Sequence, residues 1–113
     1  MLTEQQGCAV LKRVFQSRGF QVQENVPFKE DDVSFQADGW DPQSRVGYEY
    51  MTHQADDFDD LDPREIGRLG EWADAGRLYF FVIDDTNIET VEDLEWAANR
   101  FLDEVVRRKG ARP

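Results

Sequence analysis

Asp38 and Glu49 are the two residues of this sequence whose types and spacing could do chemistry. Both fall between Val33 and His53, where the residue pattern predicts two strands joined by a polar turn. Asp38 ends the first strand and Glu49 lies inside the second. Two carboxylates on neighbouring strands suit a hard divalent cation such as Mg²⁺. A cation held there would polarise a phosphoryl oxygen and lower the pKa of a bound water.

The pairing of the two strands decides whether these carboxylates meet. Alternation along the first strand separates its apolar side chains from the polar set that contains Gln36 and Asp38. We expect Asp38 to pair with Gly47, so that Gln36 lies opposite Glu49 and the three polar side chains share one face. A register shifted by one residue would place the two carboxylates on opposite faces of the sheet.

The segments before this hairpin predict a helix and a strand that must position it. Thr3 and Gln6 form a capping box that opens a helix running from Glu4 to Arg18. Alternating apolar residues predict a half-buried strand over Phe20 to Phe28. Pro27 cannot donate a ladder hydrogen bond, which indicates that this strand lies at an edge of the sheet.

The segments after the hairpin predict a helix, a strand and a second helix. Asp62 and Glu65 form another capping box. The run from Leu78 to Ile83 is apolar without alternation, which is typical of a strand buried on both faces, so we expect it to be central in the sheet. Thr90 caps the last helix, which reaches about Lys109, and its acidic start and basic end match the helix dipole.

These elements define the expected fold class. Their order is α-β-β-β-α-β-α, in which a three-stranded meander receives a fourth strand through a helical crossover. We therefore expect an α+β sandwich with a mixed four-stranded sheet covered by helices. The length of 113 residues fits a single domain over residues 1–113.

The order of elements, together with Asp38 and Glu49, resembles the restriction-endonuclease-like superfamily, which is named for its PD-(D/E)xK motif. The resemblance covers the first helix to the fourth strand, about three quarters of the chain. It implies that Asp38 and Glu49 bind magnesium, the only cofactor that this motif suggests. It also implies that a lysine two residues after Glu49 orients or activates the attacking water.

The sequence departs from that motif at two positions. Ala37 precedes Asp38 where the motif has proline, and Met51 occupies the lysine position. A methionine carries no charge and no proton to transfer, so it cannot take the role of the lysine. Lys29, at the end of the first strand, is the nearby residue that could substitute for it, and Lys12 lies on the first helix.

Composition limits the classes of partner. The net charge is −11, from 24 acidic and 13 basic residues, and such a charge repels phosphate backbones. Nucleic acid is therefore disfavoured as a ligand. The single cysteine excludes an internal disulfide and fits a reducing cytoplasm. We expect no signal peptide and no membrane span, since the longest apolar run has six residues against about 20 for a span.

Other residues with chemical potential have simpler structural roles. We expect Cys8 to be a small buried hydrophobe and His53 to be a surface histidine. Tyr48, Tyr50 and Trp40 are expected to pack the sheet rather than to stack on bases. The acidic run from Asp56 to Asp62 lacks the glycine and the final glutamate of an EF-hand loop, which indicates a solvated loop and a helix cap.

Three functions are compatible with these residues. The favoured hypothesis is a catalytically inactive superfamily member that acts as a binding or regulatory module for a protein partner. The second is a magnesium-dependent nuclease that uses Asp38 and Glu49 with a displaced lysine. The third is an acidic inhibitor or immunity-type protein that mimics a nucleic-acid backbone. Whether the chain is an enzyme stays open. It also stays open whether two copies pair through the last helix, whose apolar stripe has an edge that a second copy could contact.

Overall fold

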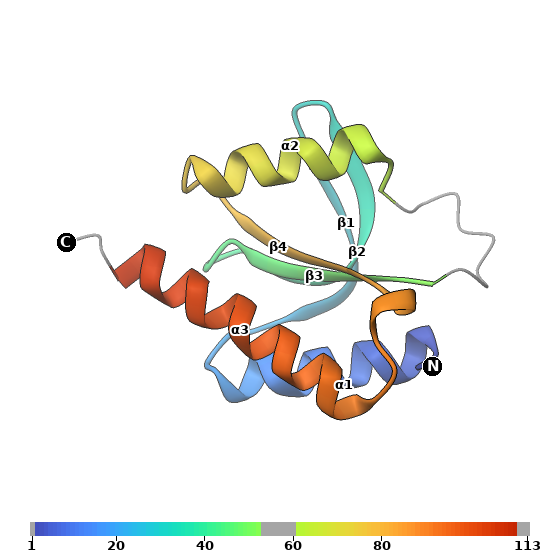
Figure 1. Ribbon diagram of the computed structural model, residues 1–113. Helices are drawn as coiled ribbons and strands as arrows, with labels where there is room; N and C mark the ends of the chain where they lie inside the picture. Colours follow the sequence, from blue (N-terminus) through green and yellow to red (C-terminus); the bar gives the residue numbers. More distant parts are fainter. Residues whose placement is uncertain (1, 53–60, 111–113) are drawn as a thin grey trace.

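A computed structural model describes residues 2–52 and 61–110, which form an α+β fold of three layers (Figure 1). Helix α2 covers one face of the sheet, and α1 and α3 cover the other. None of the described helices combines the length and the apolar composition that a membrane crossing requires. The elements are α1 (Glu4–Ser17), β1 (Gln23–Glu30), β2 (Val33–Asp41), β3 (Val46–Met51), α2 (Pro63–Asp74), β4 (Tyr79–Asp84), the 3₁₀ turn η1 (Asp85–Asn87) and α3 (Val91–Gly110).

The sheet is mixed, as the sequence predicts. Its order is β1-β2-β3-β4; β1 and β2 pair antiparallel, β2 and β3 pair antiparallel, and β3 and β4 pair parallel. The expected edge position of β1 is confirmed. The expected central position of β4 is wrong, because β4 forms the opposite edge. Its apolar run has another cause: Phe80 and Val82 pack on the α2 side, and Phe81 and Ile83 pack on the other side.

Each face of the sheet has its own hydrophobic core. The core beneath α1 and α3 includes Phe15 and Tyr48, whose rings meet edge to face at 4.9 Å. The core beneath α2 is rich in aromatic rings, and Trp40 stacks on Phe80 at 4.9 Å with an interplanar angle of 8°. Strands β2 and β3 thus lie between two packed layers, which fixes the side chains that they carry.

The predicted helix starts are confirmed by their hydrogen bonds. Both capping boxes are complete, with Thr3 at the start of α1 and Asp62 at the start of α2. At the start of α3, the Asp93 N–H donates to the Thr90 hydroxyl at 3.1 Å. Helix α1 ends at Ser17, one residue before the predicted end, and α3 extends to Gly110, one residue past the predicted end at about Lys109.

The pairing of β2 with β3 differs from the expected register by two residues. Gly39 pairs with Tyr48 and Trp40 pairs with Gly47, where the sequence predicted that Asp38 would pair with Gly47. The reason is that β2 continues to Asp41. The Asp41 carboxylate accepts hydrogen bonds from the N–H groups of Gln43 and Ser44, which confines the turn to the four residues after it.

The two strands approach closely at a pair of glycines. A Cβ atom on Gly39 would lie 2.2 Å from Cε2 of the Tyr48 ring. A Cβ atom on Gly47 would lie 2.5 Å from the Gly39 carbonyl oxygen and 2.6 Å from the Phe80 ring. Side chains at either position would push the strands apart, so this pairing depends on glycine.

Candidate functional site

Asp38 and Glu49 bind the main chain of the opposite strand. The Asp38 N–H donates to Oε1 of Glu49 at 3.0 Å, and the Tyr50 N–H donates to Oδ2 of Asp38 at 2.8 Å. Both acidic residues are buried, with 8% of Asp38 and 3% of Glu49 exposed. Two carboxylates therefore connect β2 to β3 immediately beyond the pair formed by Gly39 and Tyr48.

The other residues expected at this site do not join the pair. Gln36 is exposed, and its amide donates to the Asn25 carbonyl at 2.8 Å. Met51 is half-buried at the end of β3, opposite Asp84 of β4. Lys29 is exposed opposite Ser34, toward the far end of the β1–β2 pair.

A cleft of about 510 Å³ opens beside Asp38, between α1 and the β1–β2 pair. Its lining residues are Glu4, Gln5, Cys8, Ala9, Glu24, Asn25 and Asp38. Glu49 is not among them, although its carboxylate is near enough to Cys8 to contribute to the raised pKa of that thiol. Lys12 lies close to its rim, where Lys12 Nζ is 3.4 Å from a carboxylate oxygen of Glu24.

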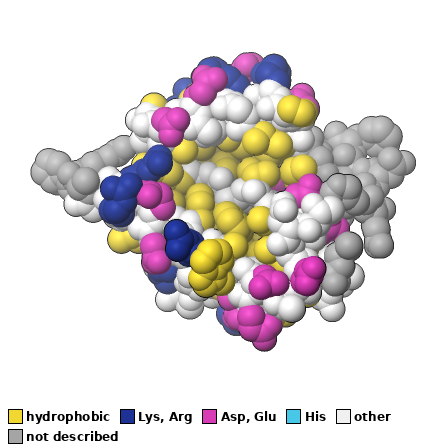
Figure 2. Space-filling view, in the orientation of Figure 1, with side chains coloured by type: hydrophobic (Ala, Val, Ile, Leu, Met, Phe, Trp, Pro, Cys, Tyr) yellow, Lys and Arg dark blue, Asp and Glu magenta, His cyan; other side chains and the backbone are white. Residues whose placement is uncertain are grey.

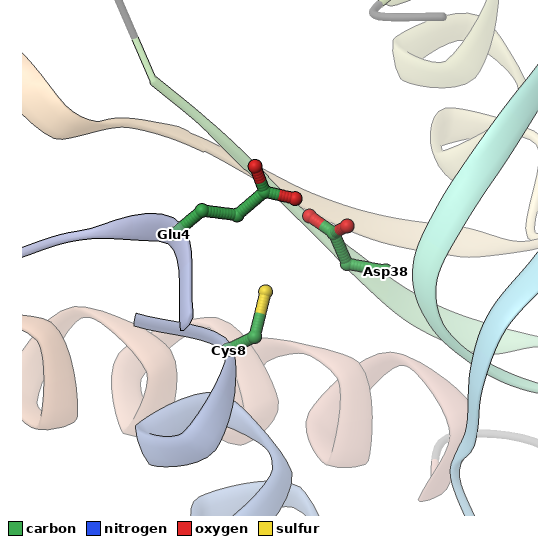
Figure 3. Close-up of side chains that lie close together, drawn as sticks. All are labelled: Glu4, Cys8 and Asp38. Atoms are coloured by element: carbon green, nitrogen blue, oxygen red, sulfur yellow. The ribbon is translucent and has the colours of Figure 1, made fainter. Parts of the chain in front are cut away.

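Three potential metal ligands meet in this cleft. Figure 3 shows the carboxylates of Glu4 and Asp38 turned toward each other, with the Cys8 sulfur beside them. Their ligand atoms all lie within 4.8 Å of one another. A thiolate with two carboxylates would suit a borderline cation such as Zn²⁺ better than Mg²⁺. A metal bound here would first have to displace the thiol proton.

The surroundings of Cys8 stabilise the protonated form of its thiol. Burial raises the pKa of the Cys8 thiol, and the nearby carboxylates of Asp38 and Glu4 raise this pKa further. The thiol is consequently neutral at physiological pH. A neutral thiol is a poor nucleophile, because the thiolate is the reactive form.

We expect Cys8 to react slowly with iodoacetamide in the folded protein. At pH 8 its rate should be at least about tenfold below that of an ordinary cysteine, whose pKa is about 8.5. Glu4→Gln should speed the reaction, because it removes one of the charges that raise the thiol pKa. The rate is measured against pH by mass spectrometry, and Cys8 is the only cysteine, so the signal is unambiguous.

Two controls complete this measurement. The urea-unfolded protein should react at the ordinary rate, and Glu95→Gln, on α3 outside the cleft, should leave the folded rate unchanged. A folded protein whose rate rises around pH 8.5 would show that the pKa of Cys8 is not raised.

The aromatic residues of the hairpin pack the sheet, as the sequence predicts. Tyr48 and Tyr50 belong to the core beneath α1 and α3, and Trp40 belongs to the core beneath α2. The Tyr48 hydroxyl is buried and has no hydrogen-bond partner among the described residues. Burial, with the carboxylates of Glu24 and Asp38 nearby, raises the pKa of Tyr48, so its phenol stays neutral.

Sequence reasoning missed two of the three clustered ligands. Cys8 was expected to be a buried hydrophobe, but it is only partly buried and contacts the cleft, and Glu4 was expected only as the first residue of the helix. Their spacing of one helical turn was the available signal, because residues at i and i+4 share a helix face. His53 and most of the acidic loop lie outside the described residues.

Comparisons with protein-family models, with curated proteins and with solved structures give no match for this chain. The candidate site therefore has to be interpreted from its own geometry.

Proposed function

We propose that this chain is a catalytically inactive domain of the restriction-endonuclease-like kind that works by binding a protein partner. One observation carries the proposal: the carboxylates of Asp38 and Glu49 accept main-chain hydrogen bonds across the β2–β3 pair. Each residue thereby gives one carboxylate oxygen a structural role. A cation bound by the motif would need oxygens of Asp38 and Glu49 directed at a common point, whereas the ligand cluster that contains Asp38 is completed by Glu4 and Cys8.

The third motif position supports the same conclusion. Met51 follows Glu49 by two residues, and its thioether can neither orient a water by charge nor accept a proton at neutral pH. Lys29 does not compensate, because it lies near the opposite end of the β1–β2 pair. A nuclease mechanism would thus lack the ammonium group that the motif supplies two residues after Glu49.

Charge also disfavours a phosphodiester substrate. The cleft carries the acidic side chains of Glu4, Glu24 and Asp38, and the whole chain carries a net charge of −11. A phosphate backbone would be repelled from such a surface unless cations intervened. Many of the basic side chains are engaged in ion pairs, such as Arg45 and Arg77 with Glu30.

A binding role is supported by the exposed apolar surface. Apolar side chains gather on one face of the molecule between α2 and α3 (Figure 2). Trp96 on α3 is 65% exposed, and large exposed aromatic side chains are typical of protein interfaces. A contiguous apolar region on a highly charged protein indicates a surface that another protein covers.

A magnesium-dependent nuclease is the second candidate, and one observation favours it. Lys12 pairs with Glu24, so an ammonium group lies at the rim of the cleft that holds the carboxylates of Glu4 and Asp38. The backbone-mimic hypothesis has weaker support. Acidic residues of the β1–β2 turn, such as Asp31 and Asp32, pair with arginines instead of forming an unpaired acidic row.

Metal titration and a cleavage assay distinguish the first two functions. We expect no saturable heat when Mg²⁺ or Mn²⁺ is added by calorimetry. We also expect no cleavage of supercoiled plasmid, single-stranded DNA or RNA. Metal-dependent cleavage that is lost in Asp38→Asn but kept in Glu24→Gln would overturn the proposal, because the second variant changes a carboxylate of the same cleft outside the motif.

A further inference from the structure

The outer edge of β4 is open to pairing with another strand. The Tyr79 N–H donates to the Arg45 carbonyl at 3.0 Å, so the main chain of Tyr79 faces β3. Because main-chain direction alternates along a strand, Phe81 also faces β3, and Phe80 and Val82 turn their N–H and C=O groups outward. No other described strand pairs with this edge. Such an edge is a template for a further strand.

The side chains around this edge are apolar on both faces of the sheet. The four residues from Phe80 to Ile83 are each only half-buried. On the α3 side, Phe101 contacts Phe81 with ring centroids 5.1 Å apart. Trp96 and Ile83 line a cavity of about 440 Å³ at the end of the strand. Figure 2 shows the resulting apolar region, which extends between α2 and α3.

Charge is distributed unequally along this surface. One end carries the basic residues that finish α3, namely Arg107, Arg108 and Lys109, together with Glu104 and Asp74, which pair with the two arginines. The other end carries the acidic residues around the start of α3, namely Glu89, Glu92 and Asp93, all exposed. In Figure 2 basic side chains, with acidic ones among them, lie at the left of the apolar region, and acidic side chains lie at its lower right. An antiparallel copy of the same surface would bring each basic end to an acidic end.

We propose that two copies of this chain pair antiparallel through β4, about a twofold axis near Val82. The pairing would join the two sheets into one, with four strands from each copy. A twofold axis perpendicular to the sheet places the α3 helices of both copies on the same face of the joined sheet. The two helices then run in opposite directions, so the acidic end of each lies toward the basic end of the other. This inference rests on the binding role proposed above and names the partner as a second copy.

Sedimentation velocity of the full chain tests the pairing. We expect the wild type to form dimers across the micromolar to millimolar range. Val82→Lys should raise the dimer Kd by about 100-fold or more, because two lysines would face each other across the axis. The matched control is Val106→Lys on α3, where the valine is 51% exposed and lies outside this surface; this variant should leave the Kd unchanged.

Amide exchange followed by NMR tests the same pairing in the wild type, without relying on a variant that must fold. The amides of Phe80 and Val82 should become protected as the concentration rises. Those of Tyr79 and Phe81, which face β3, should keep constant protection.

A wild type that stays monomeric overturns the pairing. A dimer overturns it too if Val82→Lys leaves its Kd unchanged, or if the amides of Phe80 and Val82 stay unprotected. None of these results bears on the absence of catalysis, which the metal and cleavage assays decide separately. A monomer that binds a different protein through β4 would keep the proposed binding role and reject only the second copy as its partner.

Discussion

Gly39→Ala is expected to lower the free energy of unfolding by about 3 kcal/mol or more, a large overpacking effect. The new Cβ would lie 2.2 Å from the Tyr48 ring, and something must move. The ring cannot retreat easily, because Tyr48 is fully buried and packs against Phe15. The strand cannot retreat either, because Gly39 pairs with Tyr48 in the ladder. Urea denaturation followed by circular dichroism measures the loss.

Two further variants identify the clash as the cause. Gly67→Ala, at a helical glycine where an added Cβ atom would meet nothing within 4 Å, should raise stability by up to about 1 kcal/mol. Tyr48→Leu removes the ring edge, so combining it with Gly39→Ala should cost less than the two single changes added together. Additive losses would mean that Gly39 is required for a reason other than the Tyr48 ring.

Asp38→Ala and Glu49→Ala are each expected to lower the free energy of unfolding by about 2–4 kcal/mol. Asp38→Ala leaves the buried Tyr50 N–H without its 2.8 Å acceptor, and Glu49→Ala does the same to the Asp38 N–H. Since both bonds connect the same two strands, the double variant should lose less than the sum. Asp38→Asn keeps an acceptor oxygen and should be milder than Asp38→Ala.

The control for this pair is Gln36→Ala, which changes an exposed residue of the same strand and should stay within about 0.5 kcal/mol of the wild type. The result also tests the proposed function. If removing either carboxylate leaves stability unchanged but abolishes Mg²⁺ binding, the two residues are metal ligands and the structural interpretation of the site is wrong.

Local signals in the sequence predicted the elements well. The capping boxes at Thr3 and Asp62 place the starts of α1 and α2 correctly, because each cap depends on residues within one turn of it. The order of elements and the mixed sheet also follow from local patterns. The position of β4 does not, because an apolar run shows that both faces of a strand are covered and cannot show whether both edges are paired.

The register of the hairpin and the composition of the cleft depend on contacts distant in sequence. The residue pattern predicted that the first strand ends at Asp38, but the side chain of Asp41 moves the turn further on. The juxtaposition of Asp38 with Cys8 and Glu4 requires α1 to lie across the sheet. No pattern within α1 alone predicts which part of the sheet it will cover.

The parallel pairing of β3 with β4 has a consequence for the order in which the chain folds. Strands β1, β2 and β3 are joined by short turns, so they can associate at a low cost in loop-closure entropy. Strand β4 has to cross over through α2 before it meets β3, which is the slower, non-local step in such topologies. We therefore expect the apolar segment from Tyr79 to Ile83 to be the last part of the sheet to assemble, and until it does so chaperones and neighbouring nascent chains can bind it.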